Sequence, residues 1–486
     1  MEQPPKDRMV QKQDQPDLLD RTLADVAALI RSKQLSPVEV TAAALQRIGL
    51  LNPRLNAFLT VAAESATEQA HAAEDEIQRG HYRGPLHGVP VALKDLIHVR
   101  GVRTTAGSKL LADFVPDSDA TVVEKLREAG AVLIGKTALH EFAYGITNDN
   151  PHFGPTRNPW NPHCTPGGSS GGSGVAVATG MCFAALGTDT GGSIRIPASF
   201  CGVAGLKPTF GRVSLHGVYP LGFSLDHVGP LARSVVDVGI VYQTISGFDS
   251  RDPFSVEHAS GEIGLRKDAQ GIRVGILKDY FFTRLQPDVE RAVRAALTVF
   301  AELGARVEPV DFSEKTEGTD FVDLTEASRL TLLVEALLVH REHLEKHAES
   351  LGRDVKLLLE KGREVSAADY AQAQRTRQRF RRQLEQLFHR VDVLVTPTTP
   401  LVAFPIGENK VLLDGQQEDA RTAATRLLRG FNATGHPALS VLCGFDSQGL
   451  PIGLQIIGRL WDEATVLQVG YAYEQATEWH RRRPPV

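Results

Sequence analysis

The order helix, glycine, apolar strand recurs along this 486-residue chain and restricts the folds open to it. Residues 119–135 read DATVVEKLREAGAVLIG, a helical stretch that ends at Gly130 and is followed by a β-branched strand. The same order returns in residues 289–312, with Gly304 as the stop. Helices that alternate with short apolar strands are typical of α/β proteins. We therefore predict an α/β fold with a mixed, largely parallel central sheet and helices on both of its faces.

Other segments complete this outline. Ser36, Pro37 and Glu39 form a capping box with proline at the first helical position, so a helix is expected to begin there. From about 315 to 390 the chain is charged and strongly helical, which indicates a helical insertion or cap. No linker is long enough to separate two domains. We predict one domain over residues 18–486, preceded by a disordered polar tail, and further strands at 89–96, 392–397, 438–445 and 451–458.

Charge and cysteine content exclude several classes of protein. With 53 basic and 58 acidic residues the net charge is −5, so nucleic acid and anionic membranes are not expected partners. No run of 18 apolar residues and no signal-peptide core are present, and we expect a cytoplasmic protein. The scattered cysteines lack the spacing of a zinc site or a disulfide framework. We expect buried free thiols, and neither a metal nor another cofactor; the cysteines are Cys164, Cys182, Cys201 and Cys443.

Two stretches rich in glycine and serine, 166–174 and 187–197, stand out. A flexible linker does not fit, because the first stretch runs directly into an apolar segment of core character. A phosphate loop does not fit either, because the required lysine is missing. Residues 167–171 match the GxSxG pattern of a nucleophile elbow, but the proline-rich segment before them cannot be the strand that this elbow requires.

The second stretch is a better place for a nucleophile. Residues 182–187 read as a buried strand, 188–192 as a tight turn, and the segment from Ser193 to Phe200 as the start of a short helix. Backbone N–H groups at such a junction have no helical partner and suit a developing oxyanion. Ser193 is therefore a candidate nucleophile.

A serine nucleophile needs a base. His98, His140 and His227 lie near the candidate segments, but we interpret each as a structural histidine. Lys94, at the exit of an apolar strand, is an alternative, because burial without a carboxylate would lower the pKa of its ammonium group. Asp95 could instead pair with Lys94 and keep it charged. From the residues alone, both readings of Lys94 stay open.

Residues 167–209, GGSSGGSGVAVATGMCFAALGTDTGGSIRIPASFCGVAGLKPT, closely resemble the signature of the amidase signature family. The segments GPLHGVPVALKDLI, FGPTRNPW and GFNATGHPALSVLCGF extend the resemblance to about 20–260 and 390–486. This resemblance implies a Ser–Ser–Lys triad in which Ser193 attacks the amide carbonyl. Ser169 accepts the proton of Ser193 and relays it through Lys94. The resemblance also implies a cis peptide bond between Gly168 and Ser169.

Further site residues follow from the same resemblance. The oxyanion hole is expected to consist of backbone N–H groups from Thr190, Gly191, Gly192 and Ser193. Gly168, Ser170, Asp189 and Arg195 are expected to support the loops, with Asp189 and Arg195 as a pair. Ala143 and Tyr144 are expected near the acyl pocket.

Two functions are compatible with these residues. We expect a stand-alone amidase that acts on small amides, as a monomer or homodimer, and whose substrates extend to carbamates or esters. The alternative is the glutaminase subunit of a glutamyl-tRNA(Gln) amidotransferase complex. Residues 422–440, TAATRLLRGFNATGHPALS, lack the acidic and tyrosine-bearing element that resemblance to this glutaminase would require, and this lack favours the stand-alone enzyme.

Overall fold

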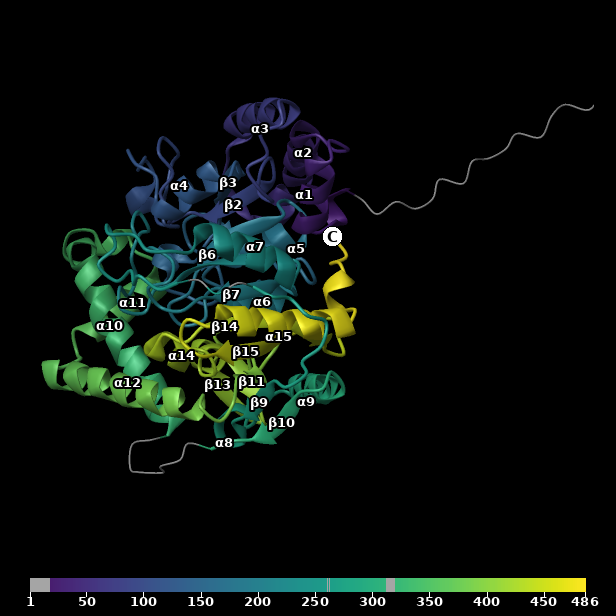
Figure 1. Ribbon diagram of the computed structural model, residues 1–486. Helices are drawn as coiled ribbons and strands as arrows, with labels where there is room; N and C mark the ends of the chain where they lie inside the picture. Colours follow the sequence, from purple (N-terminus) through teal and green to yellow (C-terminus); the bar gives the residue numbers. More distant parts are fainter. Residues whose placement is uncertain (1–17, 260, 262, 312–319) are drawn as a thin grey trace, which may run out of the picture.

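Eleven strands form one sheet through the middle of the protein (Figure 1). The computed structural model describes residues 18–259, 261, 263–311 and 320–486, so the predicted tail at 1–17 lies outside the described residues. In spatial order the strands are β1 (Phe58–Val61), β3 (Val132–Thr137), β2 (Pro90–Lys94), β6 (Ala184–Thr188), β8 (Val228–Ala232), β7 (Ala204–Lys207), β14 (Ala438–Phe445), β15 (Pro451–Gly458), β11 (Val393–Pro397), β9 (Arg273–Ile276) and β10 (Arg306–Pro309).

The predicted mixed α/β class is confirmed, with parallel pairing confined to two blocks of the sheet. Strands β3, β2 and β6 form one block, and β11, β9 and β10 form the other. From β6 to β11, through β8, β7, β14 and β15, every described pair is antiparallel, as is β1 with β3. The centre is thus more antiparallel than the helix–strand alternation suggests. One reason is that only residues 446–450 join β14 to β15, too few for the crossover that parallel neighbours need.

Two groups of helices cover the sheet. Helices α5 (Gly171–Ala178) and α6 (Arg195–Cys201) contact each other, and α7 (Val235–Ile245), α15 (Glu463–Ala476) and α9 (Pro287–Glu302) contact one another in series. Both groups contact β14 or β8, which places the sheet between them. The other helices are α1 (Leu23–Arg31), α2 (Pro37–Leu55), α3 (Ala63–Gln78), α4 (Thr121–Glu128), α8 (Lys278–Phe281), α13 (Ala420–Thr425) and α14 (Arg429–Thr434).

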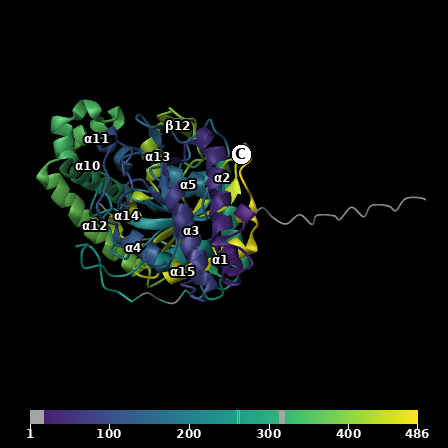
Figure 2. The same ribbon diagram turned by 90° about the horizontal axis from the view of Figure 1, so that it is seen from above.

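The charged region near 315–390 forms three helices at one side of the protein, α10 (Phe321–Lys346), α11 (Arg353–Gly362) and α12 (Ala367–Leu387) (Figures 1 and 2). Helix α10 packs on α11, on α12 and on α14. The capping box of α2 is present as predicted. All four cysteines are buried and free, as expected. Within the described part of the chain, no helix is both long and apolar enough to cross a membrane.

Helix α5 consists of glycine, serine, alanine and valine, and all of its residues are buried. Small side chains allow its backbone to approach its neighbours closely. A Cβ atom on Gly172 would lie 2.5 Å from the backbone N and O of Ala138 and from the backbone O of Ala57. These neighbours are backbone atoms and cannot rotate away. Gly172 therefore fixes how α5 sits against the segments that flank β1 and β3.

We expect Gly172→Ala to destabilise the protein by about 1–3 kcal/mol or more, because the added methyl group overpacks a site with fixed neighbours. Gly49→Ala is the control, since Gly49 lies exposed in α2 and has no atom within 4 Å of the added Cβ. That substitution should raise stability by up to about 1 kcal/mol through helix propensity. Chemical denaturation of both variants measures the difference, and equal stabilities would contradict the proposed close packing.

Candidate active site

Lys94 is the last residue of β2, and its side chain is completely buried. Its Nζ atom donates hydrogen bonds to Ser169 Oγ and to Thr188 Oγ1, both at 2.7 Å. Thr188 ends β6, which runs parallel to β2, so the two strands deliver these side chains to the same edge of the sheet. The structure thus brings the predicted Lys94 and Ser169 together. Sequence reasoning missed Thr188, although its place at the end of the strand before Asp189 was a signal.

The protonation state of Lys94 follows from its surroundings. Burial lowers the pKa of its ammonium group to about 7, and the more distant charges of Asp189 and Asp226 oppose this effect. Asp95 points elsewhere and pairs with Lys136 at 3.0 Å. Asp95 therefore does not hold Lys94 in its charged form, because Asp95 has another partner.

The two glycine- and serine-rich stretches meet at this edge of the sheet. The peptide bond between Gly168 and Ser169 is cis, as expected. The next N–H group, that of Ser170, donates to the backbone O of Ser193 at 3.2 Å. Ser170 Oγ donates to the backbone O of Thr188 at 3.1 Å and accepts from the N–H of Thr188 at 3.2 Å. Ser170 therefore ties the first stretch to the second, which fits its predicted supporting role.

Ser193 lies just before α6, at the junction that the sequence predicts. It is 7% exposed, whereas Ser169 and Lys94 are fully buried. Of the three predicted triad residues, Ser193 is thus the one that a substrate can reach.

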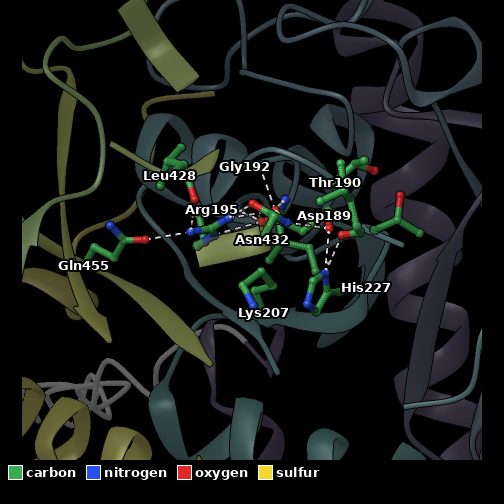
Figure 3. Close-up of polar contacts among 12 residues, drawn as sticks. Asp189, Thr190, Gly192, Arg195, Lys207, His227, Leu428, Asn432 and Gln455 are labelled. Atoms are coloured by element: carbon green, nitrogen blue, oxygen red, sulfur yellow. Dashed lines mark hydrogen bonds and ion pairs between the residues drawn. The ribbon is translucent and has the colours of Figure 1, made fainter. Parts of the chain in front are cut away.

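Asp189 braces the loop that carries Ser193 (Figure 3). Its carboxylate accepts hydrogen bonds from the N–H groups of Gly192 at 2.7 Å and Ile194 at 3.1 Å, and it pairs with Arg195 at 2.8 Å. Burial would raise the pKa of Asp189, but the guanidinium of Arg195 holds it well below its usual range. Both side chains are completely buried, so the predicted Asp189–Arg195 pair is present as a buried ion pair.

The C-terminal part of the chain completes this network. Asn432 donates to Asp189 Oδ1 at 2.8 Å, and Arg195 donates to Asn432 Oδ1 at 2.6 Å and to Gln455 Oε1 at 2.7 Å (Figure 3). Sequence reasoning named neither Asn432 nor Gln455. Asn432 lies in the quoted segment GFNATGHPALSVLCGF, but nothing in one sequence indicates that it contacts Asp189.

The predicted oxyanion donors differ in availability. The N–H of Gly192 is already donated to Asp189, so this prediction needs a correction. In the described residues, no hydrogen bond engages the N–H groups of Thr190, Gly191 or Ser193. Thr190 is held through its hydroxyl, which donates to Asp226 at 2.6 Å. Three of the four predicted donors thus remain for an oxyanion.

The loop of Asp226 is in turn fastened to the helical region. Ser224 donates to Glu335 of α10 through its hydroxyl at 2.6 Å and through its N–H at 3.0 Å. Asp226 accepts from the N–H of Leu221 at 2.8 Å. A chain of contacts therefore leads from α10 through residues 221–226 to the candidate oxyanion loop.

A cavity of about 620 Å³ lies between the helical region and the segments 140–147 and 408–429. Of the two residues predicted near the acyl pocket, Tyr144 lines this cavity, whereas Ala143 is buried and does not. The helical region contributes Arg329, Leu332 and Leu333 from α10 and Asp354, Leu357 and Leu358 from α11. Arg429 also lines the cavity, and its Cγ lies 3.5 Å from the position of a Cβ on Gly191. The cavity therefore adjoins the loop that carries the candidate oxyanion donors.

The three histidines near these segments have other partners. His140 Nε2 is hydrogen-bonded to Asp354 at 2.7 Å, and His227 Nδ1 to the backbone O of Leu225 at 2.7 Å. His98 packs edge-on against Phe114. In the described part of the chain, no histidine side chain is hydrogen-bonded to Ser169 or Ser193, which fits the structural reading of all three.

Comparisons with known proteins identify the family of this chain. The family model described as Amidase matches residues 39–467. A glutamyl-tRNA(Gln) amidotransferase subunit from Moorella thermoacetica is 41% identical over 482 residues, which cover 95% of this chain and 98% of the relative. A crystal structure of an amidase is 36% identical with a TM-score of 0.85, over 93% of this chain and 99% of the other.

A third comparison concerns a structure described as a vestigial protein complex that reveals the evolutionary origins of an s-triazine catabolic enzyme. It is 34% identical with a TM-score of 0.88, over 93% of this chain and 98% of the other. The family match and the near-complete coverage of these relatives lead to one conclusion: the chain belongs to the amidase family.

Proposed function

We propose that this chain hydrolyses the C–N bond of a small amide through an acyl-enzyme on Ser193. The observation that carries the proposal is the contact between the buried Lys94 and Ser169, beside the loop that presents Ser193. A lysine whose pKa lies near 7 can take up a proton at neutral pH, which an ordinary surface lysine cannot.

The proposed reaction begins with Lys94 as a neutral amine. Ser193 Oγ attacks the amide carbonyl, its proton passes to Ser169, and the proton of Ser169 passes to Lys94. The oxyanion that forms is bound by the free N–H groups of Thr190, Gly191 and Ser193. The C–N bond then breaks, and the proton returns through Ser169 to the leaving nitrogen, which departs as ammonia or an amine. Water, activated by the same relay, hydrolyses the Ser193 ester and releases the carboxylate.

Two settings for this chemistry remain, and the relatives favour a complex. The relative from Moorella thermoacetica is named as one subunit of an amidotransferase and aligns over nearly its whole length. This similarity supports the role of a glutaminase subunit. The sequence of residues 422–440, in contrast, favours the stand-alone amidase. It also argues against a monomer or homodimer. In either setting the proposed chemical step is the same.

Purification with and without a partner distinguishes the two settings. If the chain works within a complex, another polypeptide should co-purify from its natural source, and glutamine hydrolysis should rise strongly when that polypeptide is present. Full activity of the isolated chain on amides, unchanged by any co-purified partner, would support the stand-alone enzyme instead.

We expect Ser193→Ala to abolish amide hydrolysis without loss of stability, because it removes the nucleophile and no packing. Lys94→Ala should lower kcat/KM by about 10²–10⁴-fold through loss of the proton acceptor. Steady-state kinetics and thermal denaturation measure both effects. Turnover by Ser193→Ala above the uncatalysed rate would remove Ser193 from the proposed role.

We expect Thr188→Val to lower kcat by about 10-fold or more, because Lys94 Nζ loses one of its two hydrogen bonds and is no longer held toward Ser169. Thr188→Ser keeps the hydroxyl and should retain most of the activity. Equal kinetics of the valine and serine variants would show that the hydroxyl has no positioning role.

The pH dependence of kcat/KM on a neutral amide should follow the ionisation of Lys94. Burial lowers this pKa to about 7, and the neutral amine is the active form, so kcat/KM should fall about tenfold per unit below pH 7 and level off above it. A profile that is flat between pH 5 and pH 9 would contradict the assignment of Lys94 as the base.

A further inference from the structure

Arg429 is a buried cation without a carboxylate partner in the described part of the chain. It begins α14, is 8% exposed, and donates from Nε to Thr425 Oγ1 at 2.7 Å. Among the described residues, no carboxylate oxygen lies within 4 Å of its guanidinium, and its two terminal nitrogens have no hydrogen-bond acceptor. Buried charges in proteins are normally paired, so this arrangement is unusual.

The acidic residues that line the cavity form no ion pair with Arg429, and Glu326, which pairs with Arg329, attracts it at longer range. Asp354 is hydrogen-bonded to His140, and Asp419 caps α13 through the N–H of Thr422 at 2.8 Å. Glu408 lies exposed at the margin. The carboxylates of the lining are thus engaged elsewhere or directed to solvent.

Two further arginines give the cavity its positive character. Arg421 donates to the backbone O of Tyr144 at 2.7 Å and lies over its ring at 5.5 Å, again without a carboxylate partner among the described residues. Arg329, in contrast, pairs with Glu326 on the same helix. Burial together with the charges of Arg421 and Arg329 lowers the pKa of Arg429 to about 10, while Tyr144 and Glu326 oppose this shift. Arg429 therefore stays charged at neutral pH.

The position of Arg429 relates this charge to the proposed chemistry. Its Nε lies 4.0 Å from the position of a Cβ on Gly191, one of the free oxyanion donors. An anion bound by its terminal nitrogens would therefore lie a few bonds from an amide carbonyl placed at Ser193. A guanidinium fork matches the two oxygens of a carboxylate.

We propose that the substrate is a small amide that also carries a carboxylate, and that Arg429 binds this carboxylate. The proposal rests on the proposed function, since it places the scissile amide at Ser193. Glutamine, the substrate in the glutaminase setting, carries such a carboxylate, and in either setting the proposal adds the residue that binds it and determines specificity.

Binding without turnover tests the proposal. In the Ser193→Ala background, calorimetry compares succinamate with butyramide and glutaramate with valeramide, pairs of equal chain length that differ in the carboxylate. We expect at least one anionic amide to bind more tightly than its neutral partner, on the order of 10–100-fold. Equal binding within both pairs would overturn the proposal. Because the assay needs no hydrolysis, it keeps its meaning even if Ser193 is not the nucleophile.

Matched variants assign the effect to Arg429. Arg429→Met, of similar length and without charge, should abolish the preference for the anionic amide. Lys361→Met removes a positive charge from the same cavity at an exposed position, and should change the preference less than about threefold. A preference that survives in Arg429→Met, or is lost equally in Lys361→Met, would overturn the assignment. If Arg429→Met does not fold, Arg429→Lys replaces it and should retain only part of the preference, because lysine lacks the fork.

Discussion

The buried ion pair between Asp189 and Arg195 is the interaction on which the rest of the site depends. Asp189 fixes the loop of Ser193 through the N–H groups of Gly192 and Ile194, and Arg195 reaches Asn432 and Gln455. Two fully buried charges are stable only while each has its partner and its hydrogen bonds. The loop that presents Ser193 is therefore held in place by residues from the C-terminal part of the chain, more than 230 positions away.

Two buried lysines on neighbouring strands differ in their partners, and this difference decides whether the side chain stays charged. Lys136 in β3 pairs with Asp95 at 3.0 Å and contributes to the core as a paired charge. Lys94 in β2 has hydroxyl partners, Ser169 and Thr188, and no carboxylate at contact distance among the described residues. Hydroxyl groups solvate an ammonium ion less well than water or a carboxylate does, so burial makes the neutral amine accessible at neutral pH.

Local patterns predicted the elements, whereas contacts between distant segments could not be predicted. The strand before Ser193, the capping box at Ser36 and the three-helix region near 315–390 all follow from spacing and composition. The triad came from the family resemblance, since the residues alone left Lys94 open. Thr188, Asn432 and Gln455 were missed because periodicity reports which face of an element is buried and not which distant side chain lies opposite. The antiparallel centre of the sheet escaped prediction for the same reason.

The contacts from Glu335 through residues 221–226 to Thr190 have a consequence for engineering this scaffold. Helices α10 and α11 supply much of the cavity wall and are the natural segment to exchange with a relative when a new substrate is sought. Such a graft would also remove the hydrogen bonds from Ser224 to Glu335, leave Ser224 held by Arg377 of α12, and loosen Thr190. A chimera that changes only this wall would therefore lose part of its turnover together with its old selectivity, unless Glu335 is carried over with its geometry.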